Sequence, residues 1–314
     1  MMAAVTEVEN KTALPRYNIF KRICERYSST VSQSKRYTRS KAGNVCYICF
    51  LVFMGLFSLL PLIYCVTTSF KPIDELMIFP PRFFVSRPTV QNYLALPGLL
   101  SNLKVPLSRY IFNSVFVAAV TTVLYVFVSA MAAFVLTKSR IKGKKLMFSA
   151  VQYALLFNTF TLAIPQYLIF SYFKIIDTYW VYILPHIAST MGVFLMKQYM
   201  EGSVPDVIME AARIDGAGYF RIFAEIVLPM VKPCCMTLML FGFRDVWAAV
   251  PQGTVFNESL KTLPAIMTQI TAGGIARSGS AMAVTVIMML PPVIVYMISQ
   301  SNVIESMNSA GIKE

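Results

Sequence analysis

Long apolar segments separated by short polar ones dominate the chain. A helix needs about 20 apolar residues to cross a bilayer core of roughly 30 Å. Six segments approach that length, at 45–66, 110–136, 146–170, 178–196, 234–250 and 281–299. The fourth is interrupted by His186 and the fifth by Arg244 with Asp245. The pattern predicts an all-α polytopic membrane protein with six transmembrane helices.

The polar stretches set the expected organisation. Residues 1–44 form a basic tail that also carries aromatic residues, and residues 45–314 hold the six apolar segments. A secretory signal would place a short apolar run near the start, so the first segment is expected to be a retained anchor. Residues 201–233, which lie between the fourth and fifth apolar segments and contain charged residues, are expected to form a folded cytoplasmic loop.

Composition agrees with a membrane protein. The 314 residues are 56% hydrophobic and only 14% charged, with a mean hydropathy of +0.61. The formal charge of +13 would suggest nucleic acid in a soluble chain, but Lys and Arg accumulate on the cytoplasmic side of membrane proteins. With both termini in the cytoplasm, 19 of the 28 Lys and Arg residues lie inside, including the cluster at 138–145. Topology and anionic lipid therefore account for the charge, and a nucleic-acid partner is not expected.

The sequence offers little chemistry of its own. Cys46 and Cys49 form a C-x-x-C inside an apolar segment with no second ligand pair, and Cys24, Cys65, Cys234 and Cys235 complete a set expected to be reduced. No phosphate-binding G-x-x-x-x-G-K-[ST] loop is present, so the chain is not expected to hydrolyse ATP. His186 is the single histidine and is expected to be a packing residue. Neither a catalytic set nor a metal site is predicted.

The cytoplasmic loop contains signals for two short helices. Ser203 and Asp206 have the spacing of a capping box, and Pro205 is tolerated in a first turn, so a helix should begin near Val204. Gly216 lies where a left-handed residue ends a helix.

A second amphipathic segment follows, with apolar positions at Phe220, Ile222, Phe223, Ile226 and Val227. Pro229, and again Pro233, should stop it.

The same loop places charged side chains beside small ones. Glu210, Arg213 and Asp215 flank Ala211, Ala212 and Gly216. The alternatives are an ordinary folded loop and a surface on which another protein docks. Small residues permit a close approach and charges permit pairing, so we favour the docking surface.

The loop resembles a known family. The stretch "VPDVIMEAARIDGAGYFRIFAEIVLPMVKP" is similar to the EAA loop of the permease subunits of binding-protein-dependent ABC importers, in the carbohydrate-uptake branch that includes the second membrane subunit of the maltose transporter. The stretches "SFKPIDEL", "NYLALPG", "DTYWVYILP" and "SAGIKE" occur in the order of that branch. The likeness covers residues 45–314 and leaves the tail outside.

The resemblance implies a type I importer fold in a bacterial-type inner membrane, with the loop docking on a cytoplasmic ATPase. The coupling residues carried over by motif are Glu210, Ala211, Ala212, Asp215, Gly216, Ala217, Leu228 and Pro229. Implied partners are a second permease subunit, two ATPase subunits and an extracytoplasmic solute-binding protein. The chain is expected to bind no cofactor, with ATP and Mg²⁺ held by the ATPases.

Polar groups inside spans are candidates for the substrate path. Because adjacent helical positions do not face each other, Arg244 and Asp245 are each expected to have a separate partner. A structural role at a contact between helices or subunits and a cavity-lining role remain equally open for them.

The other path candidates are Asn158, Thr159, Gln166, Tyr167 and Trp247, with ordinary contacts between helices as the alternative. Ala248 stands where the family usually has asparagine, which puts the role of that position in doubt. The competing functions are the same machinery for a non-sugar solute and an ion-coupled secondary transporter; a membrane enzyme lacks a catalytic set.

Overall fold

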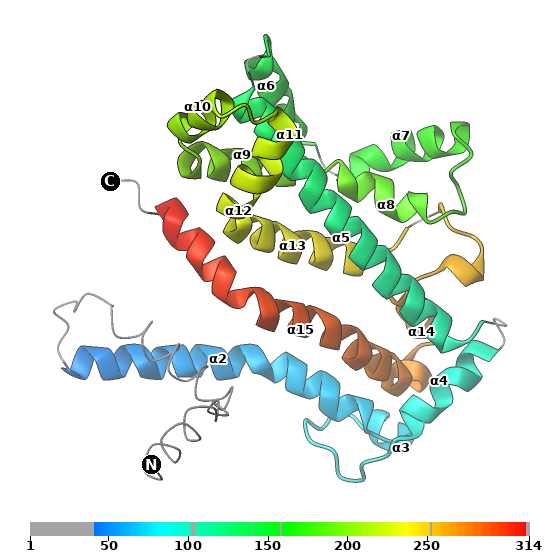
Figure 1. Cartoon of the computed structure of the whole chain (residues 1–314). Coiled ribbons are helices and arrows are strands. Elements are labelled where there is room, and N and C mark those ends of the chain that lie inside the picture. Colours follow the sequence, from blue (N-terminus) through cyan, green and yellow to red (C-terminus); the bar gives the residue numbers. More distant parts are fainter. Residues whose placement is uncertain (1–40, 102–104, 140, 158, 252, 312–314) are drawn as a thin grey trace, which may run out of the picture. The chain divides into compact units, whose positions relative to one another are not determined.

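The structure is a computed structural model that describes residues 41–101, 105–139, 141–157, 159–251 and 253–311 (Figure 1). All regular elements in these ranges are helices, as the sequence predicts. The chain forms two compact units, Met1–Leu60 and Pro61–Glu314, whose boundary lies within helix α2 (Lys41–Ser69). The tail at 1–40 and Cys24 lie outside the described residues.

The second unit contains the remaining helices. After α2, the elements in chain order are α3 (Ile73–Leu76), α4 (Gln91–Ser101), α5 (Leu107–Lys138), α6 (Lys144–Ala154), α7 (Thr159–Tyr172), α8 (Trp180–Ile187), α9 (Thr190–Ser203), α10 (Asp206–Ile214), α11 (Tyr219–Arg221), the π-helical η2 (Ile222–Val227), α12 (Leu228–Met230), α13 (Lys232–Trp247), η3 (Glu258–Leu260), α14 (Leu263–Thr271), η4 (Ile275–Arg277) and α15 (Ser278–Gly311).

Among the described residues, three single helices are long and apolar enough to cross a membrane. They are Gly43–Ser69, Leu107–Lys138 and Ile275–Gln300. A fourth candidate is the bent pair formed by Tyr219–Met230 and Lys232–Trp247, whose axes differ by 80°. The first, second and sixth predicted segments are thus single long helices, but a set of six is not confirmed.

The third and fourth predicted segments are divided. The third becomes α6 and α7, and no Pro or Gly lies at the break between them. The fourth becomes α8 and α9: Ala188 leaves the helical conformation with ψ of 35°, and the Oγ of Ser189 accepts a hydrogen bond from the amide of Gly192 at the start of the new helix. In the fifth, α13 has 16 residues, fewer than a typical span needs.

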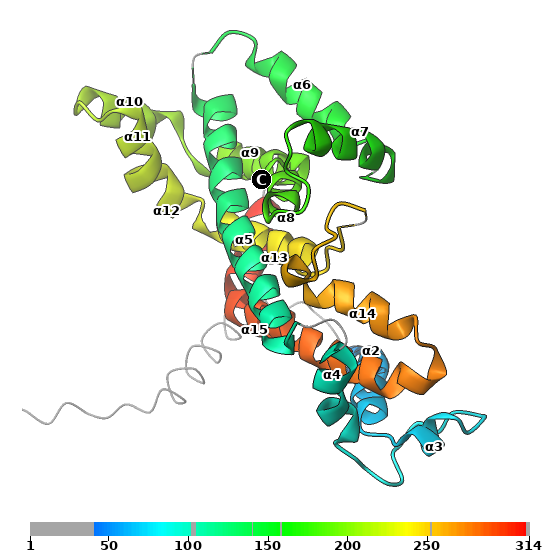
Figure 2. The same cartoon turned by 90° about the vertical axis from the view of Figure 1, so that its right-hand side faces the viewer.

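Helix α5 is the centre of the packing in the second unit. It contacts α8, α9 and α13, and Figures 1 and 2 show it running from the end where α6 and α10 lie to the end where α4 and α14 lie. Tyr110 and Val117 belong to one buried apolar cluster, and Ala133 and Phe134 belong to another. The same helix therefore contributes to the cores at both ends.

The middle of α5 is held by a close approach. The ring of Tyr125 lies between Gly192 of α9 and Gly242 of α13, and a Cβ at either glycine would come within 2.4 Å of that ring. Only glycine leaves room for an aromatic ring at these two positions.

Candidate functional site

The loop at residues 201–233 forms two helical arms joined by a turn. We call residues 204–230 the elbow: α10 is its first arm, and α11, η2 and α12 form its second. The first arm begins at Asp206, with Pro205 as the preceding cap residue, which bears out the helix start predicted near Val204.

The predicted capping box is wrong. Ser203 is the last residue of α9, and no side chain caps α10. The carboxylate of Asp206 instead accepts a hydrogen bond from Lys138 Nζ at 2.7 Å. This hydrogen bond and the lysine charge hold the pKa of Asp206 below its usual value.

The predicted left-handed turn at Gly216 is confirmed. Its φ is +80°. The amide of Gly216 donates to the carbonyl of Arg213 and the amide of Ala217 donates to that of Ala212, both at 3.0 Å. This pair of hydrogen bonds is the Schellman arrangement, which satisfies carbonyls that a helix end would leave unpaired.

The second arm differs from the prediction in two ways. Ile222, Phe223 and Val227 are buried as expected, but Phe220 is 71% exposed and does not share their face. Pro229 does not stop the arm, which continues to Met230 before the 80° bend. A proline ring clashes with the carbonyl four residues earlier in a regular α-helix. The π-helical turn of η2 widens the backbone just before Pro229, which accounts for its tolerance.

The elbow presents a mixed exposed face. Glu210, Ala211 and Asp215 are exposed, whereas Met209 and Ala212 are buried against the core. Large apolar side chains are exposed beside the charges: Val207 at 75%, Ile214 at 86% and Phe220 at 71%. Exposed apolar groups next to charges are typical of a protein-binding surface.

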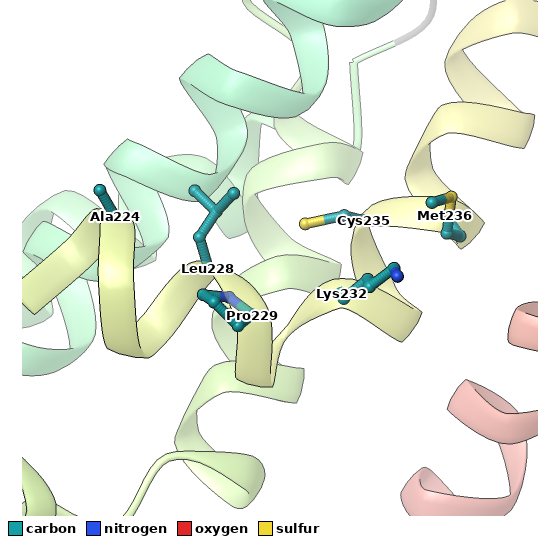
Figure 3. Close-up of a pocket in the computed structure, with 6 residues that line it drawn as sticks. All are labelled: Ala224, Leu228, Pro229, Lys232, Cys235 and Met236. Carbon is teal, nitrogen blue, oxygen red and sulfur yellow. The ribbon is translucent and has the colours of Figure 1, made fainter.

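A shallow groove lies inside the bend that follows the elbow. Its volume is about 400 Å³, and its lining is almost wholly apolar (Figure 3). Ala224, Leu228 and Pro229 line it from the second arm, and Lys232, Cys235 and Met236 line it from α13. Of the predicted coupling residues, Leu228 and Pro229 thus belong to this groove, and the other six lie at or beside the Gly216 turn.

The substrate-path candidates lie on two helices. Thr159, Gln166 and Tyr167 are on α7, with Gln166 half-buried and Tyr167 exposed. Asn158 lies outside the described residues.

Arg244, Asp245 and Trp247 are near the end of α13. Arg244 and Asp245 are exposed, and neither forms an ion pair with a described residue, so the expected partners are not found there. Trp247 is buried; its Nε1 donates to the carbonyl of Met288 at 2.9 Å and its ring stacks on Phe243. Trp247 therefore packs between α13 and α15.

Other chemistry is sparse in the described ranges. His186 Nδ1 lies 2.8 Å from the carbonyl of Tyr182 in its own helix, which fits the predicted packing role. The five described cysteines are free. Within these ranges, no group of three or more His, Cys, Asp or Glu side chains is placed to hold a metal ion.

Sequence reasoning missed two polar residues that anchor the two ends of α5. Lys138 was counted only as part of a basic cluster, yet its side chain is 6% exposed and bonded to the elbow. Asn113, at the opposite end of α5, is fully buried and hydrogen-bonded to the loop before α14. For Asn113 the available signal was an asparagine inside an otherwise apolar helix; Lys138, the last residue of α5, carried no such signal.

The relatives found by comparison with known proteins are named as permease proteins of transporters. No family model matches the chain. The chain is 26% identical over 271 residues, covering 85% of it and 96% of the relative, to the putative ABC transporter permease protein ORF2 of Caldicellulosiruptor sp. (strain Rt8B.4). It is 25% identical to the inner membrane ABC transporter permease protein YcjP of Escherichia coli (strain K12), covering 88% and 98% of the two chains. It is 28% identical to the arabinooligosaccharides transport system permease protein AraQ of Halalkalibacterium halodurans, covering 84% and 93%.

Solved structures share the fold. A chain of a bacterial ABC transporter involved in the import of the acidic polysaccharide alginate matches with a TM-score of 0.67 at 22% identity, covering 85% of this chain and 99% of that one. A chain of a bacterial alginate ABC transporter in complex with alginate pentasaccharide-bound periplasmic protein matches with a TM-score of 0.55 at 14% identity, covering 83% and 94%. The resemblance to sugar permeases of ABC importers is confirmed.

Proposed function

We propose that this chain is a permease subunit of a binding-protein-dependent ABC importer and forms half of the translocation path for a carbohydrate, with an oligosaccharide as the expected cargo. The observation that carries the proposal is the likeness over most of the chain to permease subunits, several of them named for sugar transport. The all-helical fold shared with the alginate importer chain supports it.

The membrane arrangement that fits this function has six spans. In this arrangement, α6 with α7, α8 with α9, and α13 with its preceding bend supplement the three long helices. One structural feature supports cytoplasmic termini: Lys138, which opens the basic cluster, bonds to Val204 and Asp206 of the elbow. The basic cluster and the elbow therefore lie at the same end of α5, the end that should face the cytoplasm.

The elbow is the proposed contact for a partner ATPase. Glu210, Ala211 and Asp215 supply the exposed charged and small surface, and Gly216 sets the angle between the arms. Ala212 and Ala217 pack beneath this surface, and Leu228 and Pro229 lead into the bend. ATP-driven closure of two ATPases would move this elbow toward one on a second permease subunit, with ATP and Mg²⁺ bound only by the ATPases.

Replacing Gly216 with valine tests the contact. A β-branched residue at a φ of +80° is strained, although no neighbouring atom would meet its Cβ. We expect Gly216→Val to weaken association with the ATPase by about tenfold, as measured by co-purification and titration of the purified subunits. Gly218→Val is the matched control, because Gly218 has a φ of −70° and open space around it. Normal association and solute-stimulated ATP hydrolysis in Gly216→Val would contradict the assignment.

The substrate path is proposed to include Arg244 and Asp245 of α13, with Asn158, Thr159, Gln166 and Tyr167 on or beside α7 and Trp247 as a packing support. Arg244 and Asp245 are exposed in an apolar helix and have no ion-pair partner among the described residues, which supports a polar route or a subunit contact. Asp245→Asn should reduce uptake without changing assembly, whereas Asp74→Asn, which makes the same change at an exposed aspartate of α3, is the matched control and should leave uptake unchanged. If uptake is unchanged in Asp245→Asn, Asp245 has a structural role and does not line the substrate path.

The cargo and energy source are tested together. Mass spectrometry of the ligand retained by the co-purified binding protein should identify an oligosaccharide, and a different ligand would assign the same machinery to a non-sugar solute. Uptake should stop when the ATPase is deleted. Uptake that persists would favour an ion-coupled transporter.

A further inference from the structure

Helix α5 has no residue that usually bends a helix. Its 32 residues contain neither proline nor glycine, whereas α2, α4, α7, α8 and α15 each contain an internal proline. Sharp kinks arise mainly at proline, glycine or π-helical turns. At a rise of about 1.5 Å per residue, α5 is a rod about 48 Å long.

The cytoplasmic end of this rod is tied to the first arm of the elbow. Lys138 Nζ donates to the carbonyl of Val204 at 2.6 Å and to Asp206 Oδ1 at 2.7 Å. These two acceptors flank Pro205, at the corner where α9 ends and α10 begins. Burying an ammonium group costs free energy unless the group is hydrogen-bonded. The corner between α9 and α10 is therefore held where both acceptors stay within hydrogen-bond distance of Lys138 Nζ.

The second arm is tied to the same helix by aromatic packing. The ring of Phe223 lies 5.4 Å from that of Phe134 and 6.2 Å from that of Phe127, two residues of α5 separated by two helical turns. Both arms of the elbow are thus attached to α5 over its last three turns. A displacement of the elbow must move this end of α5 or break these contacts.

The opposite end of α5 holds the loop before α14. Asn113 Nδ2 donates to the carbonyls of Ser259 and Lys261 at 2.8 and 2.9 Å, and Asn113 is fully buried. The amide of Leu263 donates to Ser114 Oγ at 2.8 Å. The backbone of residues 259–263 is therefore bonded directly to α5 side chains.

That bonded segment continues into an exposed loop. Asp177 Oδ1 accepts from the amides of Phe256 and Asn257 at 2.9 and 2.8 Å. Phe256 itself is 63% exposed. We call residues 254–263 the outer loop, since they lie at the end of α5 remote from the elbow (Figures 1 and 2).

We infer that α5 is a rigid strut that mechanically couples the elbow to the outer loop, and that Lys138 and Asn113 are the positioning residues at its two ends. The inference rests on the proposed function, which supplies the force at the elbow. A continuous helix with specific attachments at both ends transmits a displacement that a bent or loosely packed helix absorbs. The attachments made by Lys138 and by Asn113 are polar and short, so each can be removed by one substitution.

The experiment measures the outer loop while nucleotide acts on the ATPase. The complete importer complex in lipid nanodiscs is treated with MgATP and orthovanadate, and hydrogen exchange is followed in peptides covering residues 254–263. In the wild-type complex we expect nucleotide to change the exchange rate of these peptides. Lys138→Met should reduce that change by about fivefold or more, the scale of a typical coupling between sites.

Three variants separate coupling from folding. Lys142→Met is the matched control, because Lys142 is an exposed member of the same basic cluster and should leave the response intact. Lys138→Arg preserves the charge and donors and should restore most of it. Asn113→Leu should reduce the response from the other end while leaving ATPase association unchanged.

The outcomes distinguish the strut from the proposed function. A wild-type response that persists at full size in Lys138→Met or in Asn113→Leu overturns the strut and leaves the importer function standing. A wild-type chain that neither binds the ATPase nor responds to nucleotide overturns the function itself. If Lys138→Met does not assemble, Asn113→Leu alone decides, because the elbow does not contact Asn113.

Discussion

Helix α5 and the segment from Tyr219 to Trp247 are both candidate spans of apolar residues, but only one of them is straight. Helix α5 continues from Leu107 to Lys138 without interruption. The other segment changes direction by 80° at Val231. Apolar content therefore does not decide whether a span is continuous. The difference lies in Pro229, Pro233 and the π-helical turn, none of which has a counterpart in α5.

The two geometries suit different tasks. The elbow continues directly into the bend that leads to α13, yet its polar and aromatic attachments are made to α5. A bend of 80° can change its angle when a partner pushes on it, whereas a continuous helix moves as one body. Three changes test this difference. The first interrupts α5 as the other segment is interrupted, the second disturbs the packing of α5 against α13, and the third removes one attachment of the elbow to α5.

Introducing a proline into α5 should have the largest effect. Val123 is 68% exposed, so Val123→Pro changes few side-chain contacts. Proline in a helix interior removes a hydrogen bond and should lower the free energy of unfolding by about 3 kcal/mol. Thermal unfolding of the lipid-reconstituted protein measures the loss, with Val123→Ala as the control. A Val123→Pro protein as stable as the control would show that continuity of α5 is dispensable.

Sequence patterns predicted the straight helix better than the bent one. The apolar segment at 110–136 lies within α5, whose sequence contains neither Pro nor Gly to interrupt it. Gly216 was equally readable, since a left-handed residue depends on local sterics. Sequence patterns therefore predicted these two features correctly, because neighbouring residues in the chain determine them.

Long-range contacts explain the failures. Ser203 and Asp206 have the spacing of a capping box, but Lys138, far away in sequence, binds the aspartate instead. Pro229 reads as a stop signal, yet η2 accommodates it within the arm. The burial of Asn113 likewise depends on the backbone of Ser259 and Lys261. No local spacing encodes these partners.

Filling the space between the two regions should have an intermediate effect. A Cβ at Gly242 of α13 would lie 2.4 Å from the Tyr125 ring of α5. Gly242→Ala should therefore force the helices apart and cost about 1 to 3 kcal/mol of stability, as overpacking usually does. Gly202→Ala is the control, because nothing surrounds a Cβ there.

A double variant identifies the cause. Tyr125→Leu combined with Gly242→Ala should be less destabilising than the sum of the two single changes, since the clash is then relieved. If the losses of stability of the two single variants add up to that of the double variant in thermal unfolding, the Tyr125 ring does not clash with a Cβ at position 242.

Removing one attachment of the elbow to α5 should have the smallest effect, and it should depend on pH. The pKa of Asp206 is lowered in the folded protein by its hydrogen bond to Lys138 and by the lysine charge. A lowered carboxyl pKa contributes stability above the unfolded value of about 4 and loses it as pH falls through the folded value. Because Asp206 is 81% exposed, the contribution should not exceed about 1 kcal/mol.

Asp206→Asn keeps the shape of the side chain and removes its charge. Between pH 5 and 7 the variant should therefore unfold at a slightly lower temperature than the wild type, and the difference should shrink progressively as pH falls below about 4. The aromatic attachment through Phe223 does not titrate, so it should hold the second arm at every pH. A difference that is constant down to pH 3 would show that Asp206 stabilises the corner by its shape alone, and Lys138 would then act through Val204.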